Sequence, residues 1–424
     1  MISILLPLLP LDSEARVYIL LNEPSPKPFP IAIADLPTDG PKKIKGWSEG
    51  LSEQIRNDLI LTGLFDVVDR SDYPKGSLEP DKIQFPSWTL IGVQAVAGGT
   101  YSVLEDGIRI SLYLYDPFLG QQLINRNYRA KEGEVGTVAH HFADEIMKEL
   151  TGERGVSSTK IAYVCQPSKR KKGVKEICLM DMDGKNQRQL TNHRSISLSP
   201  DWSGAGNEIV YTSYIDGIPE LFTVNASGAT YQVTQNNNIN LSPRWTGQGY
   251  LTVASALDGD TELYLFSSKG KVLRQLTNSF GIDINPSWSP DGKRFVFASE
   301  RAGRLHIFSA NNDGGEIRRL TYVGYHNDNP VWSPRGDKIA FQARDAGAWD
   351  LFIMNSDGSM IQRLTANQGD NESPSWAPNG RMIVFGSTRN DALQLFIMKE
   401  DGSNQTPVGP KGGATQPSWS PWFD

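Results

Sequence analysis

Histidine, cysteine and long apolar runs are scarce in this sequence of 424 residues, which contains five histidines and two cysteines. So few metal-binding side chains, scattered along the chain, give no pattern of metal ligands. No run of about 18 or more apolar residues is present, so we expect no membrane-spanning segment. An excess of positive charge is absent too, and the net charge of −6 gives no support for nucleic acid as a partner.

The sequence also lacks the short motifs that mark common catalytic sites. It has no Gly-x-Ser-x-Gly elbow, no His-Glu-x-x-His pair and no glycine-rich phosphate-binding loop. His140 and His141 are neighbours on one predicted helix and therefore face different ways. The segment from Asp181 to Gly184 lacks the glutamate of an EF-hand loop and is expected to be a hairpin turn. We therefore predict a protein that is not an enzyme, with no catalytic residues, metal or cofactor.

What the sequence does contain is a repeat. Between residues 200 and 419 a Pro-x-Trp triplet occurs six times, and each tryptophan follows the one before it by 43 or 44 residues. The tryptophans are Trp202, Trp245, Trp288, Trp332, Trp376 and Trp419. A fixed period of this length fits a unit of four short strands, as in a β-propeller. One tryptophan per unit is interpreted as core that fills the gap between neighbouring sheets; the alternative is a ring of ligand-stacking indoles.

Each repeat is interpreted as four strands, named a to d in chain order, with tight turns from a to b and from c to d. The first repeat begins at Lys160 with strand b, and the last Pro-x-Trp triplet has no further strands after it. The C-terminal strand is therefore predicted to complete the blade that Lys160 begins. This closure gives a ring of six blades and removes the free sheet edges.

The residues before the repeats have the pattern of a small α/β domain. Strands are predicted at residues 17–21, 31–34, 65–69, 90–97 and 108–115. Helices are predicted at residues 48–62, with Ser48 as the cap and Gly63 at the end, and at residues 135–150. The predicted fold class is α+β with two domains: a small N-terminal α/β domain at 16–154 and an all-β six-bladed β-propeller, closed by the C-terminal strand, at 155–424.

Residues 1–15 are interpreted as a truncated secretory signal. An apolar run from Ile2 to Leu11 precedes the small-x-small triplet Ser13-Glu14-Ala15, although a positively charged n-region is missing. A buried N-terminal strand is the alternative.

The two cysteines are predicted to lie on adjacent strands of one blade. Cys165 falls on strand b and Cys178 on strand c of the first repeat, with the hairpin tip midway between them. In antiparallel pairing they would face each other at the separation that a disulfide requires, which would fit an oxidising compartment. Two reduced cysteines are the alternative.

Propeller geometry places the variable b–c and d–a connections on one face, and variable loops on a rigid scaffold usually carry binding specificity. The d–a loops are rich in Asn, Asp and Ser, and Asp283, Asp328 and Glu372 are expected to converge on the mouth of the central channel. Polar residues that only make turns are the alternative interpretation. Because the repeats begin at strand b, the N-terminal domain is expected to attach on the a–b side and to leave the d–a face open.

The domain order and the domain junction carry a more specific resemblance. The segments concerned are Ala143-Asp144-Glu145-Ile146, Leu150-Thr151-Gly152, Thr159-Lys160-Ile161-Ala162-Tyr163-Val164, Leu64-Phe65-Asp66-Val67-Val68-Asp69-Arg70 and Trp419-Ser420-Pro421-Trp422. With them, the chain from Arg16 to Asp424 resembles the TolB family of the bacterial Tol–Pal envelope system. The propeller repeats alone are shared with many proteins, so the N-terminal domain and the junction are the discriminating part.

The resemblance implies a monomeric, non-enzymatic scaffold in the periplasm that supports outer-membrane integrity and cell division. It implies that the lipoprotein Pal binds the d–a loop face and that TolA binds the N-terminal segment. The residues predicted to contact Pal are His193, Arg194, Asn238, Asn240, Asp283, Asn285, His326, Asp328, Asn371 and Glu372. The residues predicted to contact TolA are Arg16, Val17, Tyr18 and Ile19. A carbohydrate-active propeller enzyme that acts at the acidic channel mouth is the alternative function.

Overall fold

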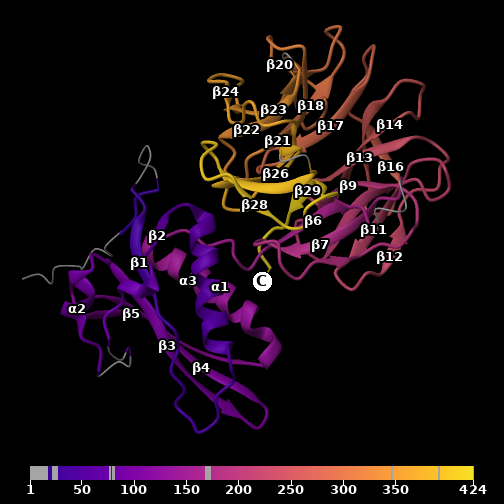
Figure 1. Ribbon diagram of the computed structural model, residues 1–424. Helices are drawn as coiled ribbons and strands as arrows, with labels where there is room; N and C mark the ends of the chain where they lie inside the picture. The colour runs from indigo at the N-terminus through magenta and orange to yellow at the C-terminus, as the bar shows by residue number, and fades with distance from the viewer. Residues whose placement is uncertain are drawn as a thin grey trace, which may run out of the picture.

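The computed structural model describes residues 18–21, 27–75, 78, 82–167, 173–344, 347–389 and 392–423. A small α/β domain is followed by a six-bladed β-propeller, as Figure 1 shows, and this confirms the predicted fold class. None of the described helices is both long and apolar enough to cross a membrane. Residues 1–15, the predicted signal segment, lie outside the described part of the chain.

The N-terminal domain is a five-stranded sheet with helices on both faces. Its strands, in sheet order, are β2 (Phe65–Val67), β1 (Phe29–Ile33), β3 (Ala95–Leu104), β4 (Gly107–Asp116) and β5 (Gln121–Ala130). Its helices are α1 (Trp47–Thr62), α2 (Phe85–Leu90) and α3 (Val135–Thr151). Ile31 and Ile33 of β1 share a core with α1 and α3, whereas Ala32 between them shares a core with Trp88 of α2. The alternation of side chains along a strand therefore accounts for the two layers.

Two strand predictions in this domain are wrong in detail, and one strand was not predicted. Within the described residues 18–21 no strand forms, because the Ile19 N–H donates to the Leu150 carbonyl at the end of α3 (3.0 Å). Leu90 ends α2 instead of beginning a strand, since Pro86 favours a helical start at this point. Strand β5 was not predicted, because it is largely exposed and polar and so lacks an apolar alternation.

Only the C-terminal end of α1 agrees with the prediction. Gly63 ends the helix with a φ of 67°, as predicted. At the other end the Ser48 hydroxyl does not cap α1, because it accepts a hydrogen bond from the Leu36 N–H (2.6 Å) and Gly46 takes the cap position.

The propeller consists of six four-stranded sheets. In ring order these are β29-β6-β7-β8 (Thr415–Trp419, Lys160–Cys165, Glu176–Asp181, Arg188–Gln189), β9-β10-β11-β12 (Ser197–Trp202, Glu208–Ser213, Glu220–Asn225, Thr230–Gln232), β13-β14-β15-β16 (Asn240–Trp245, Leu251–Ser255, Glu262–Phe266, Val272–Gln275), β17-β18-β19-β20 (Asp283–Trp288, Arg294–Ser299, His306–Asn311, Arg318–Arg319), β21-β22-β23-β24 (His326–Trp332, Lys338–Arg344, Trp349–Asn355, Gln362–Arg363) and β25-β26-β27-β28 (Asn371–Trp376, Met382–Ser387, Gln394–Lys399, Thr406–Val408).

The C-terminal strand closes the ring as predicted. β29 pairs antiparallel with β6, with Ser418 opposite Ala162 and Trp419 opposite Ile161. Trp419 is 5% exposed, and its indole N–H donates to the Thr159 hydroxyl (2.8 Å), so the last strand is fixed at the point where the chain enters the propeller.

The repeated tryptophans are core residues, as predicted. Trp202 and Trp376 are 6% and 5% exposed, and their indole N–H groups donate to backbone carbonyls of the preceding blade. Trp245 and Trp288 are more exposed but pack against buried clusters between blades. The tryptophans therefore hold neighbouring blades together and do not form an exposed ring for ligand stacking.

The glycines of the c–d turns also hold the blades close together. Gly270 has a φ of +80°, and a Cβ at this position would lie 1.9 Å from the Val233 carbonyl of the preceding blade. Gly314 is equivalent, with a φ of +88° and a hypothetical Cβ contact of 2.0 Å to the Leu276 carbonyl. These turns therefore require glycine for its backbone conformation and also for space.

Cys165 and Cys178 form the predicted disulfide, with their Cα atoms 5.8 Å apart. The expected register is wrong, because Tyr163 lies opposite Cys178 and Cys165 lies opposite Glu176. The two cysteines are diagonal neighbours on one face of the sheet, which are still within reach of each other.

The N-terminal domain attaches to the a–b and c–d turns, as predicted. Asn404, in the turn between β27 and β28, donates to the Leu61 carbonyl at the end of α1 (3.0 Å). Arg381, in the turn between β25 and β26, donates to Glu153 after α3 (2.7 Å). Figure 1 shows α1 and α3 beside this side of the propeller. The opposite face, formed by the b–c and d–a loops and called the loop face below, points away from the N-terminal domain.

Candidate partner-binding face and domain interface

The d–a loops end in the same backbone conformation around the channel mouth. In all six blades the residue before the Pro-x-Trp proline has a φ between 47° and 55°. These residues are Ser199, Ser242, Asn285, Asn329, Ser373 and Gln416. Such positive φ values are uncommon for residues other than glycine, and asparagine tolerates them best. Five of the six, all except Ser242, line a cavity at the mouth.

The cavity has a volume of about 350 Å³ and an acidic character. Its charged lining residues are Lys175, Arg244, Asp328, Asp370 and Glu372. Asp328 accepts hydrogen bonds from the Asn285 side chain (2.8 Å) and from the Asn329 N–H (2.6 Å). Burial raises the pKa of Asp328, although the hydrogen bond from Asn285 opposes the shift. Burial, followed by the charges of Asp370 and Asp328, raises the pKa of Glu372.

The cavity brings together only part of the predicted site. Asn285, Asp328 and Glu372 line it. The prediction that Asp283 reaches the mouth is wrong, because its side chain is fully buried in an ion pair with Arg301 (2.6 Å). Asn240 and Asn371 are also 0% exposed, so all three residues at the start of strand a support the loops from beneath.

The remaining predicted residues lie outside the cavity lining: His193, Arg194 and Asn238 are on the d–a loops, and His326 begins β21. His193 is hydrogen-bonded through Nε2 to the Tyr211 hydroxyl (2.7 Å). The ring of His326 packs edge-on against Trp349, with a centroid distance of 5.4 Å. Both histidines are therefore held by aromatic neighbours.

A buried network that the sequence analysis missed fixes the d–a loops. In four blades a carboxylate at the start of strand c accepts a hydrogen bond from the threonine that follows strand d. The pairs are Glu176–Thr191, Glu220–Thr234, Glu262–Thr277 and Asp350–Thr365. Glu220 also accepts hydrogen bonds from the Asn236 and Asn237 N–H groups (3.1 and 2.9 Å), where the loop begins. The available signal was an acidic residue 14 or 15 positions before each threonine.

The sequence analysis also missed an apolar surface on the loop face. Phe280, Tyr322, Val323 and Tyr325 are 91%, 69%, 70% and 55% exposed, and we call them the aromatic patch. They lie on two successive d–a loops, at the entries to β17 and β21. The signal in the sequence was the presence of large apolar residues in loops that are otherwise rich in Asn, Asp and Ser.

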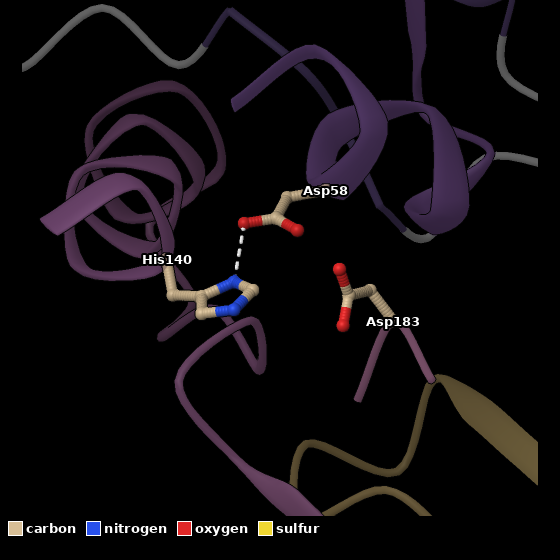
Figure 2. A group of neighbouring side chains, drawn as sticks. All are labelled: Asp58, His140 and Asp183. Atoms are coloured by element: carbon tan, nitrogen blue, oxygen red, sulfur yellow. Dashed lines mark hydrogen bonds and ion pairs between the residues drawn. The ribbon is translucent and has the colours of Figure 1, made fainter. Parts of the chain in front are cut away.

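The domain interface contains a buried ion-pair cluster, shown in Figure 2. His140 on α3 lies between Asp58 on α1 and the turn after β7. Its Nδ1 is 2.7 Å from Asp58 Oδ2, and its Nε2 is 3.7 Å from Asp181 Oδ2. Burial opposes the charge of His140, but the interactions with Asp181 and Asp58 outweigh it and raise its pKa to about 10. Burial raises the pKa of Asp58 to about 6, against the hydrogen bond from His140. A cationic histidine therefore joins the two domains at neutral pH.

The three side chains drawn in Figure 2 offer nitrogen and oxygen atoms within 4.8 Å of one another, the spacing of a possible metal site. The two propeller carboxylates already form ion pairs with lysines, since Lys160 contacts Asp181 (2.5 Å) and Lys185 contacts Asp183 (3.4 Å). Gln54 of α1 also donates to Asp183 (2.8 Å). Three carboxylates thus face three cations, and we interpret the cluster as an ion-pair network.

A second set of interface contacts reaches the N-terminal residues. Arg381 donates both to Glu153 (2.7 Å) and to the Leu21 carbonyl (3.3 Å). Arg381 also lies 3.4 Å from Glu400, so this guanidinium is surrounded by acceptors from both domains. Leu21 is thereby tied to the propeller directly.

The residues predicted to contact TolA are only partly described. Tyr18 donates through its hydroxyl to Asp116 (3.0 Å), and Ile19 is 5% exposed within the core of the N-terminal domain. Both side chains therefore pack against this chain itself. Arg16 and Val17 lie outside the described residues.

Comparisons with protein-family models agree with both domains. The model described as the TolB beta propeller domain matches residues 147–423. The model described as the TolB amino-terminal domain matches residues 17–123.

Curated relatives and solved structures point the same way. The "Tol-Pal system protein TolB" of Anaeromyxobacter sp. (strain K) is 35% identical over 225 residues, 52% of this chain and 50% of the relative. That of Geobacter sulfurreducens is 38% identical over 180 residues, 41% of each chain. The chain thus spans about half the length of the curated relatives it matches, or less.

Among solved structures, the crystal structure of TolB from Acinetobacter baumannii has a TM-score of 0.82 and 26% identity, over 93% of this chain and 97% of that one. A putative TolB from Agrobacterium tumefaciens, at 22% identity and a TM-score of 0.50 over 61% of this chain and 92% of that one, is similar in fold alone.

Proposed function

This chain belongs to the TolB family, and on that basis we propose that it is a non-enzymatic periplasmic scaffold of the Tol–Pal system. In this proposal the loop face of the propeller binds the lipoprotein Pal, and the N-terminal segment binds TolA. The scaffold links inner-membrane Tol proteins to Pal and so supports outer-membrane integrity and cell division.

The observation that carries the Pal part of the proposal is the loop face itself. It lies opposite the domain interface, and its loops are held by buried carboxylate–threonine pairs such as Glu220–Thr234 and Glu262–Thr277. Loops fixed in this way lose little further entropy when a partner binds. Exposed aromatic rings beside an acidic mouth combine the apolar and polar groups that protein interfaces use.

Coupling between the two partners would run through the domain interface. Arg381 holds the Leu21 carbonyl and Glu153 together on the propeller. Tyr18 and Ile19 have to leave their present positions before they can contact TolA, because both pack against the N-terminal domain. Binding of TolA would therefore compete with contacts that this chain makes to itself.

The disulfide supports a periplasmic location. Both cysteines of the chain are used in the Cys165–Cys178 bond, within a single hairpin of the propeller. Disulfides of this structural kind persist in oxidising compartments such as the periplasm and are rare in the cytosol.

The rival function, a carbohydrate-active enzyme at the mouth, has weaker support. Raised pKa values at Asp328 and Glu372 would suit acid–base chemistry. Asp328 is nevertheless occupied by hydrogen bonds from Asn285 and Asn329, and no histidine is part of the cavity lining in the described residues. The geometry therefore favours recognition of a partner.

The direct test is calorimetric titration of the full chain with the periplasmic domain of Pal from the same organism. Asp328→Arg is the test variant, because a large cation at the mouth would replace a carboxylate that is paired with Asn285. Glu316→Arg is the matched control, since Glu316 is exposed in a c–d turn on the face away from the loop face. We expect the parent and the control to bind Pal equally and Asp328→Arg to lose binding while its circular dichroism spectrum remains that of a folded propeller.

Absence of Pal binding by the parent chain would overturn the proposal. Release of sugar from peptidoglycan fragments, abolished by Asp328→Asn, would favour the rival enzyme instead.

A further inference from the structure

The aromatic patch on the loop face is a group of exposed apolar side chains that the fold does not explain. Phe280 is 91% exposed and Val323 is 70% exposed, although both follow buried strand endings at Thr277 and Thr321. Exposed apolar clusters of this kind on a soluble domain usually mark an interaction surface.

The patch is built from three loops that converge. The loop after β16 carries Phe280, and its Ile282 carbonyl accepts a hydrogen bond from the Glu300 N–H in the b–c loop (3.0 Å). On the other side of that b–c loop, the Arg304 guanidinium lies 4.1 Å from the centre of the Tyr325 ring. One b–c loop therefore connects the two d–a loops that present the apolar rings.

The backbone of the patch is fixed before any partner arrives. The Ser279 N–H donates to the buried Glu262 (2.6 Å), next to Phe280. The Asn327 side chain donates to the Val323 carbonyl (3.1 Å), and the Tyr322 hydroxyl donates to the Arg319 carbonyl (3.2 Å). A rigid surface of this kind binds at a small entropic cost, and aromatic side chains have few rotatable bonds to freeze.

Two guanidinium groups lie against the rings of the patch. Arg304 stacks over Tyr325, Arg319 stacks over Tyr322 at 4.9 Å, and the Arg344 carbonyl accepts a hydrogen bond from the Tyr325 N–H. The Arg344 guanidinium donates to the Gly347 carbonyl, whereas neither the Arg304 nor the Arg319 guanidinium forms an ion pair with a carboxylate in the described part of the chain. Arg304 and Arg319 are therefore available to carboxylates of a partner.

We propose that the aromatic patch is the main anchor of the loop face for Pal, and that it receives an apolar side chain of Pal bordered by carboxylates. This inference rests on the proposed function and places the strongest contacts off the propeller axis. Aromatic and arginine residues dominate the binding energy of many interfaces, which is the composition of this patch and its border. The acidic mouth then contributes orientation, and the patch contributes most of the affinity.

The test compares single variants of the full chain in calorimetric titrations with the Pal periplasmic domain. We expect Phe280→Ala and Tyr322→Ala each to weaken binding by roughly 10- to 30-fold, as interface anchors do. Arg304→Glu should also weaken binding, because it places a negative charge opposite the carboxylates of Pal. The loss of affinity should be larger at low salt than at high salt, since salt screens the repulsion. Met360→Ala is the matched control, since Met360 is 78% exposed in a c–d turn outside the loop face, and it should bind like the parent.

The four substituted residues are exposed, so each variant should keep the melting temperature of the parent. A loss of binding can then be assigned to the lost contact and not to misfolding. Parental affinity in Phe280→Ala and Tyr322→Ala, together with lost binding in Asp328→Arg, would refute the patch and leave the proposed function standing. Failure of the parent to bind Pal at all would remove the proposed function and this inference with it. A concentration-dependent dimer that Phe280→Ala dissolves, without an effect on Pal, would assign the patch to a second copy and would also overturn the inference.

Discussion

Replacement of His140 by alanine tests the ion-pair cluster that joins the two domains. The His140 side chain is 7% exposed and lies between Asp58, which is 0% exposed, and Asp181, which is 8% exposed. Its removal leaves Asp58 buried with only the Gln54 amide as a hydrogen-bond donor (2.8 Å). Removal of one partner from a buried ion pair typically costs about 3–5 kcal/mol. We expect a loss of this size in the free energy of unfolding at pH 7.5.

The pKa values predict how this loss depends on pH. The pKa of His140 is raised from 6.5 to about 10, so its stabilising effect is complete below pH 6.5 and disappears as the pH rises through 10. This shift corresponds to a stabilisation on the order of 5 kcal/mol, which agrees with the value for a broken buried pair. The pKa of Asp58 is raised to about 6, so below that pH the carboxyl becomes neutral and the missing cation matters less. The difference between parent and variant should therefore be largest between about pH 6 and 7 and should shrink as the pH rises further.

The assay is chemical denaturation of the full chain at several pH values, followed by circular dichroism. His141→Ala is the matched control, because His141 is the next residue on α3, is exposed and is hydrogen-bonded to the Ser158 hydroxyl (3.2 Å). It should change the free energy of unfolding by less than about 0.5 kcal/mol. The double variant His140→Ala with Asp58→Asn should recover part of the loss, since no buried charge then lacks a partner. A His140→Ala protein within about 1 kcal/mol of the parent at pH 7.5 would refute this reasoning.

Three further predictions concern the propeller. Trp419→Ala should lower the free energy of unfolding by about 3–5 kcal/mol, because it removes a 5% exposed side chain from the strand that closes the ring; a denaturation midpoint equal to that of the parent would contradict this role. Gly270→Ala should lower the free energy of unfolding by about 3 kcal/mol, because the added Cβ clashes with the Val233 carbonyl. Gly292 has a similar φ but open space around it, so Gly292→Ala should lower this free energy by only about 1 kcal/mol. Equal losses in the two variants would show that space is not the constraint. The Cys165–Cys178 bond joins residues 13 positions apart, so its reduction should lower the free energy of unfolding by about 3 kcal/mol. Thermal melting with and without reductant measures this loss, and Pal binding should remain intact.

The architecture of the propeller was predictable because its signals are repeated. Six tryptophans at a constant spacing determine the number of blades, and the missing strands after Trp419 indicate how the ring closes. The polar strand β5 and the segment 18–21 were not predictable in the same way. An edge strand with exposed polar side chains gives no apolar pattern, and the backbone of Ile19 is paired with Leu150, which is distant in sequence.

The sequence predicted where the candidate site lies better than it predicted which residues form it. Asp283 lies three residues before Pro286, whereas Asp328 lies two residues before Pro330, and this one-residue difference separates the buried partner of Arg301 from the carboxylate at the mouth. The buried Asn240 and Asn371 share the position of Asp283 in the repeat, a signal that the sequence analysis did not use. The pairing of His140 with Asp58 and Asp181 is a product of domain docking, since the three residues come from α1, α3 and the propeller.

The most direct test of the central claim is hydrogen–deuterium exchange of the full chain with and without the Pal periplasmic domain. The proposal predicts slower exchange in the loop-face segments around Phe280, Tyr322 and Asp328, and no protection by Pal in the c–d turns such as that at Gly314. Protection of the c–d turns with unchanged exchange across the loop face would contradict the claim that this face holds the partner.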